Sequence, residues 1–116
     1  MIRAVIMAKE YLGNLELMVL LSLMRVGDNA YGVPISQEIE LRTGRDVALG
    51  SVYAALDRLE RKGFVTSTLG DPTPERGGRA KRYFQITAKG VREVRDAQRM
   101  LTNMWKNLSV LQGEMV

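Results

Sequence analysis

The 116-residue chain contains no cysteine and no histidine. Without cysteine it can form no disulfide framework, and without either residue a metal ion could be held only by carboxylates and other oxygen ligands. The longest apolar run, LELMVLLSLM, contains Glu16 and is followed by Arg25, and it is far shorter than the ~20 residues of a membrane span. The sequence therefore predicts a cytoplasmic protein with no metal, no other cofactor and no membrane partner.

Charge is distributed unevenly along the chain. The net charge is +4, but residues 42–90 carry ten cations and only five anions. Four of those cations, Arg76, Arg79, Lys81 and Arg82, lie in or beside the loop of PERGGRAKRYFQIT. A concentrated basic region is typical of a nucleic-acid-binding surface, although a solvated basic face is also common.

The pattern of apolar residues and turn formers predicts three helices, a hairpin and a long final helix. Glycines end the first three helices, and Pro34 suits the first turn of the second. Runs rich in β-branched residues predict two strands around an extended loop. The expected helices cover 14–26, 34–43, 49–62 and 88–111, and the expected strands cover 64–70 and 80–87.

The third helix has the clearest amphipathic pattern. Val52, Ala55, Leu56 and Leu59 follow the spacing of one buried face, whereas Tyr53 falls outside that stripe. The element order predicts a mainly α fold with a small β-hairpin, a winged helix-turn-helix domain followed by a long C-terminal dimerisation helix.

The last helix shows a repeat of its own, with apolar residues alternating by three and four positions. This is the seam of a coiled coil, and a helix of ~35 Å is too long for one small domain to cover. We expect residues 1–87 to form the winged-helix domain and residues 88–116 the dimerisation helix. The expected homodimer interface is Val94, Ala97, Leu101, Met104, Leu108 and Leu111.

Three motifs resemble those of the PadR family of transcriptional regulators. They are AYGVPISQEI, then GSVYAALDRLERKGFV, similar to the family's recognition helix, and GGRAKRYFQITAKG, similar to its wing. The resemblance covers residues 12–92. It departs from the family at Ala54, where many members have Pro, and at Ala48, where a capping Ser or Thr is usual. It implies a dimeric repressor, with one C-terminal helix as in short members, relieved by a small molecule or another signal.

A winged helix places its third helix, here 49–62, in the major groove of double-stranded DNA, with the basic wing, 70–82, reaching phosphates or the minor groove. A two-fold dimer should bind an inverted-repeat operator. Ser51 could equally cap the helix, and Arg42 and Arg45 could equally be ordinary surface residues. The expected DNA contacts are Ser51, Tyr53, Arg58, Arg76, Arg79, Lys81, Arg42 and Arg45.

Trp105 and the winged helix as a whole each allow a second interpretation. Trp105, with Met100 and Met104, could border a pocket for a small planar hydrophobic effector, or Trp105 could simply anchor the dimer interface. A winged helix can also be a protein-binding module without DNA contact, but the cationic wing argues against that. An enzyme is not expected, because no nucleophile–base pair is spaced for catalysis.

Overall fold

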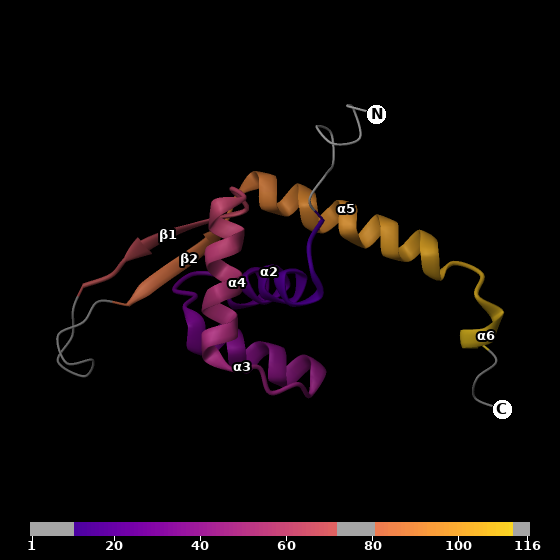
Figure 1. Ribbon diagram of the computed structural model, residues 1–116, viewed down its shortest axis with the longest axis horizontal. Helices are drawn as coiled ribbons and strands as arrows, with labels where there is room; N and C mark the ends of the chain where they lie inside the picture. Colours follow the sequence, from indigo (N-terminus) through magenta and orange to yellow (C-terminus); the bar gives the residue numbers. More distant parts are fainter. Residues whose placement is uncertain (1–10, 72–80, 113–116) are drawn as a thin grey trace.

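The computed structural model describes residues 11–71 and 81–112. In chain order these residues form α2 (Asn14–Val26), α3 (Gly32–Thr43), α4 (Leu49–Arg61), β1 (Val65–Leu69), β2 (Arg82–Ile86), α5 (Ala88–Trp105) and α6 (Ser109–Gln112). Figure 1 shows α2, α3 and α4 gathered together, the hairpin beside α4, and α5 leading away from the hairpin.

The ends of the three-helix unit follow from local chemistry. The Gly13 amide donates to Glu16 Oε1 at 2.9 Å, which satisfies one of the free N–H groups at the start of α2. Gly27 and Gly44 end α2 and α3 with φ values of 76° and 74°, in the region that favours glycine. The helix predicted to start at Pro34 begins two residues earlier, at Gly32.

The core lies between the three helices and one face of the hairpin. β1 and β2 pair antiparallel with Val65 opposite Ile86, and the Phe84 amide also donates to the Ala30 carbonyl at 2.8 Å. Phe84 is thereby held beneath the helices, where it is the largest fully buried side chain. The other fully buried apolar residues are Val19, Leu20, Ala30, Ile35, Ile39, Val52, Ala55, Leu56, Leu59 and Val65.

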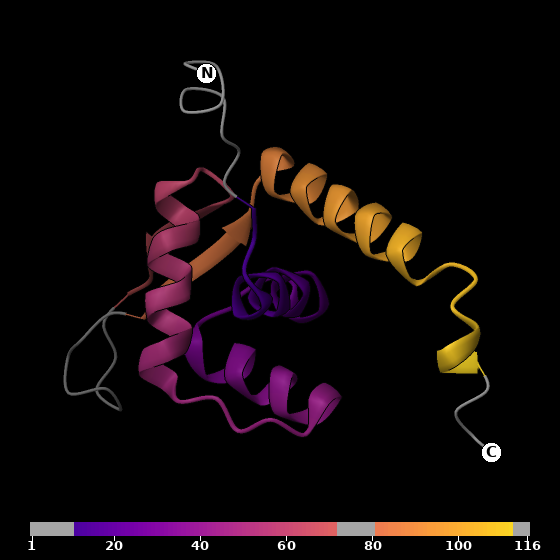
Figure 2. The same ribbon diagram turned by 45° about the vertical axis from the view of Figure 1, so that its right-hand side comes forward.

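Helix α5 begins against the hairpin. The Thr87 hydroxyl accepts a hydrogen bond from the Gly90 amide at 3.0 Å, as expected of an N-cap. Gly90 lies so close to Phe64 that an added Cβ would overlap the Phe64 carbonyl oxygen and come within 2.7 Å of Ile86 Cγ1. This close approach fixes the direction in which α5 leaves the hairpin, and Figure 2 shows it extending away from α4.

The prediction of one continuous helix from 88 to 111 is wrong. Helix α5 ends at Trp105, because Lys106 has extended backbone (ψ 134°) and Asn107 has a φ of 58°. Asparagine accepts that left-handed conformation more readily than most residues. The apolar seam therefore loses its helical register after Met104, and Leu108 and Leu111 lie beyond a break.

The arrangement is a winged helix-turn-helix with a long C-terminal helix, which confirms the predicted fold class. No helix in the part of the chain that the structure describes has both the length and the apolar character needed to cross a membrane.

Candidate nucleic-acid interface

Helices α3 and α4 form the helix-turn-helix. Ile35 and Ile39 of α3 pack into the core with the buried stripe of α4, and the connection is held by Ser36 Oγ donating to the Val47 carbonyl at 3.2 Å. Helix α4 starts after Ala48, whose side chain offers no cap, so backbone bonds from Ser51 and Val52 to the Ala48 carbonyl close its first turn. Ser51 is exposed on that first turn.

The sequence pattern suggested that Tyr53 lies on the free outer surface of α4, but the structure places it elsewhere. Its hydroxyl accepts a hydrogen bond from the Gly32 amide at 3.2 Å, and its ring lies 6.3 Å from that of Phe84. Gly32 leaves the space for it, since a Cβ there would come within 2.6 Å of Tyr53 Oη. Tyr53 is thus a link between α4 and the start of α3.

Arg58 belongs to an ion cluster that sequence reasoning missed. Glu16 of α2 is 4% exposed, and its carboxylate accepts from Arg58 Nε at 3.0 Å and from Lys62 Nζ at 3.1 Å. Burial raises the pKa of this carboxyl, but the hydrogen bonds from the Gly13 amide, Lys62 and Arg58 outweigh it and hold the pKa below its usual value. A signal was present, because Glu16 occupies the same i, i+3, i+4, i+7 stripe as the core residues Val19, Leu20 and Leu23.

The wing is tied to α4 by Arg82. Its guanidinium pairs with Asp57 at 3.1 Å and with Glu60, and its Nε donates to Ser67 Oγ at 3.3 Å. Strand alternation places Arg82 on the same face as Phe84, over whose ring the guanidinium lies at 4.9 Å. The hairpin and α4 are consequently held as one unit.

The remaining expected DNA contacts occupy different situations. Lys81 lies over the Tyr31 ring at 4.4 Å, at the base of the wing. Arg42 pairs with Glu38 at 2.8 Å on the surface of α3, and Arg45 is exposed in the turn before α4. The expected contacts Arg76 and Arg79 lie outside the described residues.

The expected dimer seam divides into two parts. Val94 and Ala97 are each 8% exposed because they pack inside their own chain, so these two of the six seam residues are not free for a partner. Beyond them, Met104 is 73% exposed and Trp105 60% exposed, with Leu101, Leu108 and Leu111 also exposed.

An apolar groove of ≈ 700 Å³ lies between α2 and α5. Of the three residues expected to border a ligand, Trp105 lines it, whereas Met100 and Met104 are not among its lining residues. The groove is lined by Asn14, Leu17, Leu21, Met24, Val91, Val94, Arg95, Gln98, Leu101, Thr102 and Trp105.

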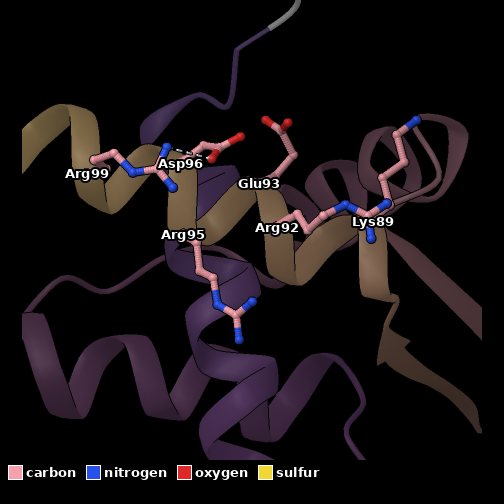
Figure 3. A pocket seen from close by; sticks show the side chains of 6 residues that line it. All are labelled: Lys89, Arg92, Glu93, Arg95, Asp96 and Arg99. Carbon is pink, nitrogen blue, oxygen red and sulfur yellow. Dashed lines mark ion pairs between the residues drawn. The ribbon is translucent and has the colours of Figure 1, made fainter.

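A second hollow, of ≈ 420 Å³, runs along α5 and is lined by charged residues only. Figure 3 shows its four cations and two acids, with Arg99 paired to Asp96 at 3.2 Å. The charged lining residues are Lys89, Arg92, Glu93, Arg95, Asp96 and Arg99.

The described residues contain no group of three or more acids placed to hold a metal ion.

Comparison with solved structures identifies the same fold in several bacterial and archaeal proteins. A transcriptional regulator from Thermoplasma acidophilum superposes with a TM-score of 0.69 at 22% identity, covering 85% of this chain and 90% of its own. One from Clostridium thermocellum gives 0.65 at 26% identity, covering 80% and 88%. A PadR-like regulator from Bacillus cereus gives 0.62 at 24%, covering 81% and 89%.

Comparison with curated protein sequences gives no match. The family model of the PadR-like transcriptional regulators, by contrast, matches residues 20–96. That match runs from the middle of α2 through the helix-turn-helix and the wing into α5, and so includes every element of the candidate interface. The chain belongs to the PadR-like family of transcriptional regulators.

Proposed function

We propose that this protein is a homodimeric repressor that binds an inverted-repeat operator. In this proposal, the exposed face of α4 enters the major groove and the wing follows the adjacent backbone or minor groove. The observation that carries it is the attachment of the wing to α4 through Arg82, Asp57 and Glu60. A helix and a wing that are already held in one orientation can bind neighbouring grooves with a smaller loss of conformational entropy.

The cations around this unit support contact with phosphates. Arg45 precedes α4, Lys81 stands at the base of the wing, and Arg58 is half-exposed with its guanidinium oriented by Glu16. We place Tyr53 in a supporting role, because its hydroxyl is engaged with Gly32. The proposed contacts are Ser51, Arg42, Arg45, Arg58, Lys81 and, in the wing loop, Arg76 and Arg79.

The exposed apolar end of α5 supports dimerisation. Leu101, Met104 and Trp105 present exposed apolar surface near the end of α5, and Leu108 and Leu111 of the next segment continue it. Exposed apolar surface of this kind on a small domain is typical of an interface. We propose that the dimerisation part begins near Gln98, ten residues later than the sequence pattern suggests.

The groove beside Trp105 supports a role for a small effector. Its lining is mainly aliphatic with one indole, which suits a planar hydrophobic molecule. An effector there would release DNA by favouring a different angle between the two DNA-binding units, which requires unequal affinity for the two arrangements.

The decisive measurement is a fluorescence-anisotropy titration on DNA from upstream of the protein's own gene, beside a scrambled duplex and across a salt series. We expect selective binding with a steep salt dependence. Arg79→Ala should weaken binding nearly equally on all sequences and lower the salt slope by about one.

Two outcomes would count against the proposal. Binding no stronger than to the scrambled duplex, repeated with fragments selected from the whole genome, would favour a protein-binding winged helix instead. An unchanged salt slope in the Arg79 variant would remove that residue from the phosphate contacts.

A further inference from the structure

The exposed surface near the start of α4 carries only small or apolar side chains. Val52 and Ala55 are fully buried, and Tyr53 is engaged with Gly32. The exposed residues of the first two turns are Leu49, Gly50, Ser51 and Ala54. Arginine, lysine, asparagine and glutamine are absent from all of them.

These missing residue types are the ones that read purines in the major groove. Arginine and lysine bind the O6 and N7 of guanine, and asparagine and glutamine bind the N6 and N7 of adenine. The first acid on α4, Asp57, which could accept from cytosine, is paired with Arg82. The first cation, Arg58, donates its Nε to Glu16.

The exposed side chains at the start of α4 are therefore apolar, except for the hydroxyl of Ser51. Leu49 is 42% exposed, and Ala54 presents a methyl group on the outward face. Gly50, between them, has open space where a Cβ would stand, so the DNA can approach the backbone there. Thymine alone among the four bases carries a methyl group, at C5, in the major groove.

We propose that Leu49 and Ala54 read the C5-methyl groups of thymines, so that each operator half-site is specified by thymine positions rather than by guanine. This inference rests on the proposed DNA binding and adds the chemical basis of its specificity. Ser51, which can donate to or accept from any base, would add little discrimination of its own.

The test uses the full-length protein and begins with selection of binding sites from a random duplex library. Each thymine of the selected half-site is then replaced singly by deoxyuridine, which removes only the methyl group. We expect a three- to fourfold loss of affinity at one or more positions, which corresponds to about 0.8 kcal/mol for one buried methyl.

The Leu49→Ala variant assigns that effect to the protein. In this variant the thymine-to-deoxyuridine difference should disappear at one position per half-site and persist at the others. Leu41→Ala is the matched control, because Leu41 is 74% exposed on α3 and offers the same substitution outside α4. The control should retain every methyl effect of the unaltered protein.

The outcomes separate the two proposals. If no sequence is enriched over the starting library, DNA recognition itself fails and the inference falls with it. If sites are enriched and bound selectively but deoxyuridine changes no affinity, the repressor proposal stands and the methyl inference is overturned. A half-site whose affinity depends on guanine N7, shown by 7-deazaguanine, would overturn it in the same way.

Discussion

The hydroxyl of Tyr53 on α4 accepts a hydrogen bond from the amide of Gly32 at the start of α3, at 3.2 Å. The bond joins the two helices of the helix-turn-helix at the end of α4 that would face DNA. The position of α4 therefore depends on a residue whose side chain points inward.

Replacing Tyr53 by phenylalanine should lower stability more than DNA affinity. The variant removes the acceptor for the buried Gly32 amide while keeping the ring, so we expect a loss of about 1 kcal/mol in the free energy of unfolding. Urea denaturation measures this loss. Tyr31→Phe is the control, because it also removes one tyrosine hydroxyl while keeping the ring, which packs edge-on against Tyr83. A Tyr53→Phe protein of unchanged stability but much weaker DNA binding would instead indicate direct contact.

Replacing Glu16 by glutamine should loosen α2 from α4. Glutamine can still accept from the Gly13 amide, but Arg58 and Lys62 lose a charged partner that is almost completely buried. We expect a loss of about 1–3 kcal/mol in the free energy of unfolding. The control is Glu38→Gln, which breaks only the surface pair with Arg42 and should cost no more than ~0.5 kcal/mol. Equal losses in the two variants would contradict the assigned role of Glu16.

The same carboxylate predicts a dependence of stability on pH. The pKa of Glu16 is lower in the folded protein than its ordinary value of 4.5, so the folded state favours the ionised form. Its contribution to stability should be complete above about pH 4.5 and should be lost as the pH falls through the lower, folded pKa. Unfolding measured from pH 7 down to pH 3 should show a steeper decline for the unaltered protein than for Glu16→Gln. Parallel curves would rule out a contribution from this group.

Substituting Met104 by aspartate should separate the proposed dimer. Met104 is 73% exposed in the single chain, so a charge there should leave the fold intact. Within an apolar interface the same charge would lose its hydration, and we expect the dimer dissociation constant to rise about 100-fold. Light scattering coupled to gel filtration reports the mass, and Leu41→Asp on α3 serves as control. A Met104→Asp protein that remains dimeric would place the interface elsewhere.

Local sequence patterns were sufficient for much of the molecule. The glycines after α2 and α3 and the cap at Thr87 depend on interactions between near neighbours in the chain. The stripe of α4 and the two strands pack against distant residues, but their residue patterns repeat locally. Such local signals can be recognised before the fold is known. The order of these elements predicted the winged-helix architecture, whereas the PadR-like motifs were recognised by their resemblance to a known family.

Only the tertiary structure decided which side chains are free to act. By their spacing, Tyr53 and Arg58 lie outside the apolar stripe of α4. In the structure they form hydrogen bonds with Gly32 and Glu16, which are 21 and 42 residues away in the chain. Val94 and Ala97 fit a dimer seam by spacing, but both are buried within their own chain. The left-handed Asn107 then breaks the helix along which the apolar spacing is continuous in the sequence. Periodicity reveals which residues share a face of a helix, whereas the partner of that face is set by packing between segments far apart in the chain.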